Sequence, residues 1–283
     1  MHLYQTSAGI GRLEAGELAI LDVPHPDVAT LLGDPGADPA RARVLERQPL
    51  SDATIRMPMR TGKLILLGAN YHSHIKEAGL QVPPRAAGLV IPSLPLNDPF
   101  GAIVLPDDAP GQVDYEGEVA VLIGKGGRSI APGTGWEYIA GLCVANDVSA
   151  RDVQLAGMEG GRVTDMSLVV KGKAYPTFKP LGPCVVTADE VRHGRGLRLR
   201  TLVNGEERQN AQTSDMVFGF AAVVEGVSAD IELSPGDIIL TGTPAGVGLA
   251  SRRFLKPGDV VEVEVEGIGA IRNEVVVGEP SAR

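Results

Sequence analysis

Two glutamates separated by one residue, Glu116 and Glu118, begin an apolar run that extends to Ile123. Side chains two positions apart on a strand share one face, so both carboxylates should point the same way. Like charges repel, and buried charges must be paired or coordinated. The pair therefore indicates either a solvated strand edge, where acidic residues are usually found, or one side of a cation site.

A third carboxylate, Asp147, stands at the end of another apolar run that begins at Gly141. Functional sites are commonly built where buried strands end. Three carboxylates from two strands would form an oxygen-only donor set that suits Mg²⁺ and also Mn²⁺ or Ca²⁺, whereas the chain lacks a Cys/His cluster for zinc. Ser149 and Asp152 have the spacing of a capping box, so we expect Asp152 to cap a helix.

A histidine and a glutamate three residues apart, His74 and Glu77, precede Gly79 in a segment that predicts a short helix with a glycine stop. Residues three apart lie on one helix face. A carboxylate beside an imidazole orients the ring and raises its basicity, as a general base requires. The alternative is a surface helix that carries both residues incidentally.

The elements that would position these groups are mostly strands. The chain has 36 Gly and 21 Pro, and short apolar runs separated by turn residues predict a β-rich architecture. Asn204-Gly205 predicts a two-residue hairpin turn. We expect a small N-terminal accessory domain over residues 1–60 and a catalytic domain over 61–283, with helices near 71–79, from about 149 and over 214–227.

Charge and composition exclude several classes of partner. The chain has 26 Lys plus Arg against 35 Asp plus Glu, a net charge of −9, so nucleic acid and anionic membranes are not expected partners. It contains no apolar run long enough to span a membrane and no signal peptide, which predicts a cytoplasmic protein. The glycine-rich loops match no nucleotide-binding pattern. Cys143 and Cys184 lie in apolar segments, as expected of buried reduced thiols.

Taken in order, these segments resemble the fumarylacetoacetate hydrolase family. The resemblance covers roughly residues 62–270, and an ordered series of motifs is far more specific than any one of them. The motifs are Asn70-Tyr71-x-x-His74-x-x-Glu77, Asp114-Tyr115-Glu116-x-Glu118, Asn146 to Gln154, Gly172-Lys173, Gly182-Pro183, Val203-Asn204-Gly205 and Pro235 to Pro244.

The resemblance implies a β-rich α+β fold, a mixed β-sandwich roll, in a homodimer that binds a divalent metal and a small oxo-acid. It implies metal ligation by Glu116, Glu118 and Asp147, catalysis by His74, Glu77, Lys173 and Gln154, and substrate binding by Tyr71, Arg151 and Thr243. Two features differ from the family pattern. No lysine occurs between Glu77 and Gly124. The segment 155–167 is longer than in typical members of the family, and it is expected to be a lid, a specificity loop or a tolerated surface insertion.

The leading hypothesis is Mg²⁺-dependent hydrolysis of a carbon–carbon bond in an acylpyruvate-type 1,3-dicarbonyl acid. His74 would activate water, and the metal would stabilise the departing enolate. The nearest alternative is decarboxylation or tautomerisation of an oxo-diacid such as oxaloacetate or 2-hydroxyhepta-2,4-diene-1,7-dioate. A second alternative is a non-enzymatic β-domain that binds Ca²⁺.

Overall fold

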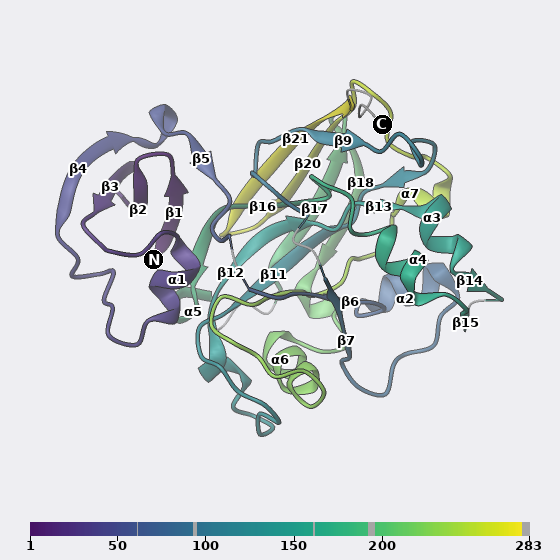
Figure 1. The fold of residues 1–283 in the computed structure, drawn as a ribbon, viewed down its shortest axis with the longest axis horizontal. Coiled ribbons are helices and arrows are strands. Elements are labelled where there is room, and N and C mark those ends of the chain that lie inside the picture. Colours follow the sequence, from purple (N-terminus) through teal and green to yellow (C-terminus); the bar gives the residue numbers. More distant parts are fainter. Residues whose placement is uncertain (61, 93–94, 161, 192–195, 279–283) are drawn as a thin grey trace.

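Two large β-sheets form the centre of the computed structural model, which describes residues 1–60, 62–92, 95–160, 162–191 and 196–278 (Figure 1). The strands are β1 His2–Thr6, β2 Gly9–Glu14, β3 Glu17–Leu21, β4 Val44–Pro49, β5 Ile55–Arg56, β6 Leu64–Leu67, β7 Gly88–Ile91, β8 Leu96–Asn97, β9 Ile103–Leu105, β10 Val113–Asp114, β11 Gly117–Ile123, β12 Ile139–Asn146, β13 Ser149–Ala150, β14 Met158–Glu159, β15 Arg162–Val163, β16 Lys179–Thr187, β17 Arg198–Val203, β18 Glu206–Gln212, β19 Ile238–Leu240, β20 Val260–Val265 and β21 Gly269–Val277. The α-helices are α1 Val28–Gly33, α2 His72–Ala78, α3 Arg151–Ala156, α4 Met166–Lys171, α5 Ala188–Val191, α6 Phe220–Ser228 and α7 Gly248–Ser251.

The larger sheet has the strand order β4-β3-β2-β1-β16-β12-β11-β19-β6-β7, and the smaller sheet has the order β18-β17-β20-β21-β9. β11 and β12, at the centre of the larger sheet, pack against β17, β20 and β21 of the smaller one. The predicted β-rich α+β class is confirmed. Strands β1 to β4 continue the larger sheet beyond β16 and form the lobe at the left of Figure 1. A domain boundary at residue 60 stays a prediction.

Strand β11 is buried on both faces, as its continuous apolar run predicts. Val119 and Val121 belong to the apolar cluster shared with the smaller sheet, whereas Ala120 and Leu122 belong to the cluster on the opposite face, which also contains residues of α1. Because side chains alternate along a strand, Glu118 continues the second set. The sheet therefore directs this carboxylate away from the smaller sheet.

Gly117, between the two glutamates, lies where β11 packs directly against β17 and β20 of the smaller sheet. A Cβ atom there would lie 2.1 Å from Thr201 Oγ1 and 3.0 Å from a methyl group of Val263. Thr201 is fully buried on β17, so its stiff, β-branched side chain cannot turn into solvent. The close packing of the two sheets therefore leaves no room for a side chain at position 117.

Gly117→Ala is expected to lower the free energy of unfolding by about 1–3 kcal/mol, because one extra carbon must be accommodated in a packed core. Urea denaturation measures the loss. Gly111→Ala is the matched control, since a Cβ at Gly111 meets no atom within 4 Å. Equal stability of the two variants would contradict the packing explanation.

Two local predictions are confirmed in detail. Helix α2 ends at Gly79, which adopts the left-handed conformation with φ of 64°. The β17–β18 hairpin turns at Asn204 and Gly205, both with positive φ, at 54° and 77°.

The predicted capping box before α3 is wrong. Ser149 belongs to β13, which pairs with β10, and its hydroxyl donates to the carbonyl of Asp147 at 2.9 Å. Asp152 accepts from its neighbour Val153 instead of closing a box. Strand pairing and the nearby polar site direct Ser149 inward, away from the start of the helix.

The helix predicted over 214–227 starts later, at Phe220. Asn70 binds the preceding segment, since its carbonyl accepts from Val217 N at 2.8 Å and its side-chain oxygen accepts from Phe218 N at 2.9 Å. These long-range bonds hold the segment extended. Asn70 thereby ties the start of α2 to the chain before α6.

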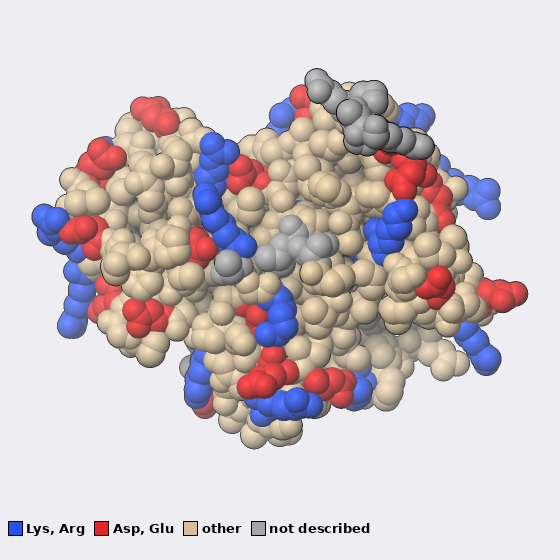
Figure 2. Space-filling model, viewed as in Figure 1, with Lys and Arg blue, Asp and Glu red and all other residues tan. Residues whose placement is uncertain are grey.

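Cys143 and Cys184 are buried and free, as expected. Within the described ranges, no helix is long and apolar enough to cross a bilayer. On the face shown in Figure 2, Lys and Arg side chains are interspersed with Asp and Glu, and the described residues form no extended basic patch there.

Candidate active site

The three predicted metal ligands come together at one end of β11 and β12. The antiparallel register pairs Glu118 with Ala145 and Gly117 with Asn146, and Asp147 N donates to the carbonyl of Glu116 at 2.8 Å. Glu116, Glu118 and Asp147 are all buried, and one oxygen from each lies within 4.8 Å of the others. Strand pairing alone therefore assembles a buried cluster of three carboxylates, the acidic cluster.

Lys173 places its ammonium group against this acidic cluster. Its Nζ lies 2.7 Å from Glu116 Oε2, 2.6 Å from Asp147 Oδ2 and 2.9 Å from Ser149 Oγ. The ammonium group thus shows where a cation is stable among the carboxylates. Gly172 allows this approach, because a Cβ on it would lie 2.9 Å from the carbonyl oxygen of Ala150.

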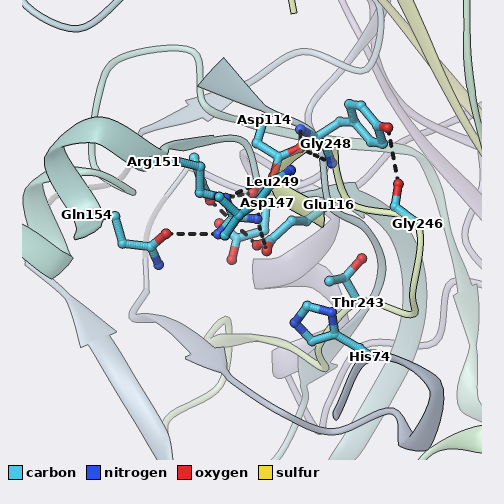
Figure 3. A network of polar contacts seen from close by, with 12 residues as sticks. His74, Asp114, Glu116, Asp147, Arg151, Gln154, Thr243, Gly246, Gly248 and Leu249 are labelled. Atoms are coloured by element: carbon cyan, nitrogen blue, oxygen red, sulfur yellow. Dashed lines mark hydrogen bonds and ion pairs between the residues drawn. The ribbon is translucent and has the colours of Figure 1, made fainter. Parts of the chain in front are cut away.

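Through Asp114, Arg151 connects the acidic cluster to the start of α7. Its guanidinium donates to Asp114 at 2.9 Å, to Glu116 at 2.5 Å and to Gln154 at 2.8 Å (Figure 3). Asp114 in turn accepts from the backbone of Gly248 at 2.6 Å. Arg151 and Gln154 are therefore brought to the site, but their polar groups already bind one another and the acidic residues.

Glu116 and Glu118 differ in their electrostatic surroundings. Burial would raise the pKa of Glu116, but the charges of Arg151 and Lys173 outweigh it and hold that pKa well below its usual range. Burial, together with the charges of Asp147 and Glu116, raises the pKa of Glu118 well above its usual value. Its carboxylate accepts the N–H of Gly242 at 2.6 Å. Glu118 is thus the ligand that loses its proton least readily when no cation is bound.

Glu118→Gln is expected to change how stability depends on pH when a chelator is present. Above the ordinary value of 4.5 the unfolded Glu118 is ionised while the folded one keeps its proton, so unfolding releases a proton and stability falls as pH rises. The slope is at most about 1.4 kcal/mol per pH unit. The variant should be more stable than wild type at neutral pH and equal to it near pH 4.5. Parallel urea-denaturation curves across this pH range would contradict the assignment.

A second lysine at the acidic cluster, Lys179, was missed by the sequence analysis. It is the first residue of β16 and is 1% exposed. Its Nζ lies 3.0 Å from Asp147 Oδ1 and donates to the carbonyl of Val148 at 2.8 Å. Burial outweighs the attraction of Asp147 and lowers the pKa of Lys179 to about 8. The available signal was a lysine at the start of a run that is otherwise apolar and buried.

The candidate base, His74, lies on α2 beside Thr243 and below the acidic cluster in Figure 3. Its Nδ1 is 3.6 Å from Glu77 Oε2, beyond hydrogen-bond distance. Glu77 instead accepts the N–H of Gly246 at 3.0 and 3.1 Å. The structure therefore places the two residues side by side without a direct hydrogen bond.

Two predicted substrate-binding residues lie beneath the site surface. Tyr71 is fully buried, its hydroxyl has no partner among the described residues, and burial with the charge of Glu118 raises its pKa. Thr243 is 4% exposed, and its hydroxyl donates to the carbonyl of Gly117 at 2.9 Å and accepts from Gln209 at 2.8 Å. Substrate binding by these two residues stays a prediction.

The residues of the acidic cluster fit a divalent metal ion. All three donors are carboxylate oxygens, the set that suits Mg²⁺ and Mn²⁺. Asp147 Oδ1 is buried and accepts no hydrogen bond from the described residues, although it forms an ion pair with Lys179 at 3.0 Å. The ammonium group of Lys173 already occupies a position between two of the carboxylates. Which ion binds there stays a prediction.

Comparison with known proteins identifies similar chains. The family model described as "Fumarylacetoacetate (FAA) hydrolase C-terminal" matches residues 63–276. The chain is 40% identical over 240 residues to "Oxaloacetate tautomerase Fahd2a, mitochondrial" of Rattus norvegicus, covering 84% of this chain and 74% of that protein.

Solved structures of similar enzymes also match almost the whole chain. The 2-hydroxyhepta-2,4-diene-1,7-dioate isomerase of Mycobacterium marinum is 31% identical with a TM-score of 0.76 over 98% of both chains. The maleylpyruvate hydrolase of Sphingobium sp. SYK-6, solved with manganese(II) and pyruvate, is 29% identical with a TM-score of 0.74 over 99% of this chain and 100% of that one. The expected mixed β-sandwich roll is thereby confirmed. The homodimer and the cytoplasmic location stay predictions.

Proposed function

The chain belongs to the fumarylacetoacetate hydrolase family and is an enzyme of that superfamily, and from this premise we propose that it interconverts the keto and enol forms of a small 2-oxo diacid. The observation that carries the proposal is the buried acidic cluster with Lys173 against it. The Lys173 ammonium, together with a metal ion held by the carboxylates, would suit a substrate that becomes more negative at one oxygen during reaction.

Hydrolysis, the leading hypothesis from the sequence, has less support than its alternative. The relative at 40% identity is named a tautomerase, and one of the two structures compared is an isomerase. The non-enzymatic Ca²⁺-binding alternative has no support, because these relatives are named as enzymes. Tautomerisation needs no attacking water, which agrees with the absence of a direct hydrogen bond between His74 and Glu77.

Glu116, Glu118 and Asp147 would hold the divalent ion, Mg²⁺ or Mn²⁺; the hydrolase from Sphingobium was solved with manganese. A bound ion of this kind acts as a Lewis acid that polarises a carbonyl oxygen. Arg151 and Lys173 keep Glu116 ionised, so this ligand need not lose a proton before it binds the ion.

The chain's own residues would move the proton. His74 would accept a proton from the carbon next to the 2-oxo group, because imidazole is the most frequent general base. The ammonium of Lys173 would stabilise negative charge that develops on the oxygen and could return a proton to it. The proton leaves carbon and arrives at oxygen, so the reaction neither consumes water nor releases a fragment.

Hydrolysis is the second candidate, favoured by the position of Glu77 beside His74 at 3.6 Å. Catalytic hydrogen bonds are often long before substrate binds. A small approach of Glu77 would complete a dyad able to activate water.

Isotope exchange followed by NMR separates the two reactions. With oxaloacetate and Mg²⁺ or Mn²⁺ in D₂O, a tautomerase exchanges the C3 hydrogens faster than the metal alone and keeps the carbon skeleton intact. A decarboxylase releases CO₂ and pyruvate, and a hydrolase cleaves acylpyruvates into two acids. No acceleration of exchange, together with cleavage of an acylpyruvate, would overturn the proposal in favour of hydrolysis.

A further inference from the structure

Lys179 is a buried cation to which the proposed reaction assigns no role. Its ammonium donates to the carbonyls of Val148 at 2.8 Å and Lys173 at 2.5 Å and lies 3.0 Å from Asp147 Oδ1. The two carbonyls accept hydrogen bonds, and Asp147 Oδ1 forms an ion pair with the ammonium group. The positive charge of Lys179 is therefore held in place from three sides.

Asp147 lies between two lysines that differ in access to solvent. Lys173 binds Oδ2 at 2.6 Å through a side chain that is 11% exposed, whereas Lys179 faces Oδ1 through a side chain that is 1% exposed. The Lys173 ammonium lies against the oxygens that an ion would use, so an ion would move it away from these oxygens while leaving it in the site, where the proposed reaction uses it. Lys179 lies on the other oxygen of Asp147 and would remain.

The formal charges around the acidic cluster show what a remaining cation does. With a divalent ion bound and all four carboxyl groups of the site ionised, these groups face three cations besides the ion, which leaves one positive charge. The carboxyl groups are those of Asp114, Glu116, Glu118 and Asp147, and the cations are Arg151, Lys173 and Lys179. Without Lys179 the ion-loaded site would be neutral.

We propose that Lys179 is a specificity-determining residue: its fixed charge weakens the hold of the site on the divalent ion and makes the loaded site attract an anionic substrate. The inference rests on the proposed function, because it takes the substrate to be an oxo-acid that carries carboxylates. Charges this close interact strongly when buried, since solvent screens them poorly. Lys179 therefore acts through charge and needs no contact with the substrate.

The test measures two affinities in each protein, those of Mn²⁺ alone and of oxalate for the Mn²⁺-loaded protein. Lys179→Met keeps the length of the side chain without its charge, and Lys179→Gln also keeps donors for the two carbonyls, so it serves if the methionine variant does not fold. Both variants should bind Mn²⁺ about tenfold more tightly and oxalate about tenfold more weakly than wild type. Electron paramagnetic resonance of free Mn²⁺ and calorimetry give these constants.

Lys171→Met is the matched control. Lys171 pairs with Asp108 at 2.7 Å, and its side chain is 51% exposed, so the variant removes the same charge from the surface of the neighbouring helix. It should leave both affinities unchanged. Opposite shifts for the two ligands identify a charge effect, because a merely structural defect would weaken both.

The outcomes separate the two proposals. Unchanged or weaker Mn²⁺ binding in a folded Lys179 variant, or unchanged oxalate binding, overturns the role of Lys179 and leaves the proposed function intact. A wild type that binds no Mn²⁺ overturns the metal site and the role of Lys179 together. A wild type that binds Mn²⁺ and oxalate but does not accelerate hydrogen exchange overturns only the tautomerase assignment.

Discussion

Glu116→Gln is expected to abolish turnover and to weaken divalent-ion binding by more than about 100-fold. Mutating a residue that only hydrogen-bonds to a metal ligand already costs up to about 100-fold in affinity, and Glu116 would be a ligand itself. The charge of Glu116 also holds Arg151 at 2.5 Å and Lys173 at 2.7 Å in a buried setting. Leaving these cations with a neutral amide should cost about 3–5 kcal/mol of stability when no metal is present. Calorimetric titration with Mn²⁺, urea denaturation and the exchange assay measure the three effects.

Glu264→Gln is the matched control for this substitution. Glu264 is the middle glutamate of the alternating series Glu262, Glu264 and Glu266, and it lies on β20, where its side chain is 42% exposed and pairs with Arg200 at 3.0 Å. An exposed ion pair of this kind contributes at most about 1 kcal/mol. Metal affinity in Glu116→Gln equal to that of the control would remove Glu116 from the metal site.

His74→Ala is expected to reduce turnover by about 10²–10⁴-fold, the usual contribution of a general base, and to leave Mn²⁺ affinity unchanged. His74 comes from α2, whereas the carboxylates lie around the start of β11 and just after β12, so the ion would lose no ligand. Alanine is also the best helix former, so the helix should persist. Turnover in the exchange assay and calorimetric titration with Mn²⁺ measure these two properties.

His72→Ala is the matched control, because His72 lies on the same helix but is exposed to solvent. It should retain wild-type turnover and metal binding. Wild-type turnover by His74→Ala would end its assignment as the base, and a loss of Mn²⁺ binding would place it in the metal site instead.

Local patterns predicted the elements that carry the site. Helix α2 and its end at Gly79 depend on neighbouring residues, and so does the turn at Asn204-Gly205, because a left-handed backbone requires residues that tolerate it. The burial of β11 was visible in its unbroken apolar run. Predicting the acidic cluster required one further inference, that β11 and β12, which are close in sequence, pair with each other.

Long-range contacts decided what local patterns could not. The spacing of Ser149 and Asp152 predicted a cap, yet β13 pairs with β10 and Ser149 donates to Asp147. Helix α6 starts later than predicted because Asn70 binds the backbone of Phe218, which is 148 residues away in sequence. Each of these outcomes replaces a weak local preference with a contact between segments distant in sequence, the β10–β13 pairing in one case and the hydrogen bonds of Asn70 in the other.

The sequence by itself determined the family, the β-rich fold and the acidic cluster, because strand alternation and ordered motifs depend on residue types and their spacing. Only the tertiary structure showed that Arg151 and Thr243 already use their polar groups inside the protein, and that Lys179 holds a second positive charge against Asp147. The physical reason is that a buried polar group must find partners, and distant segments that meet in the folded chain supply them.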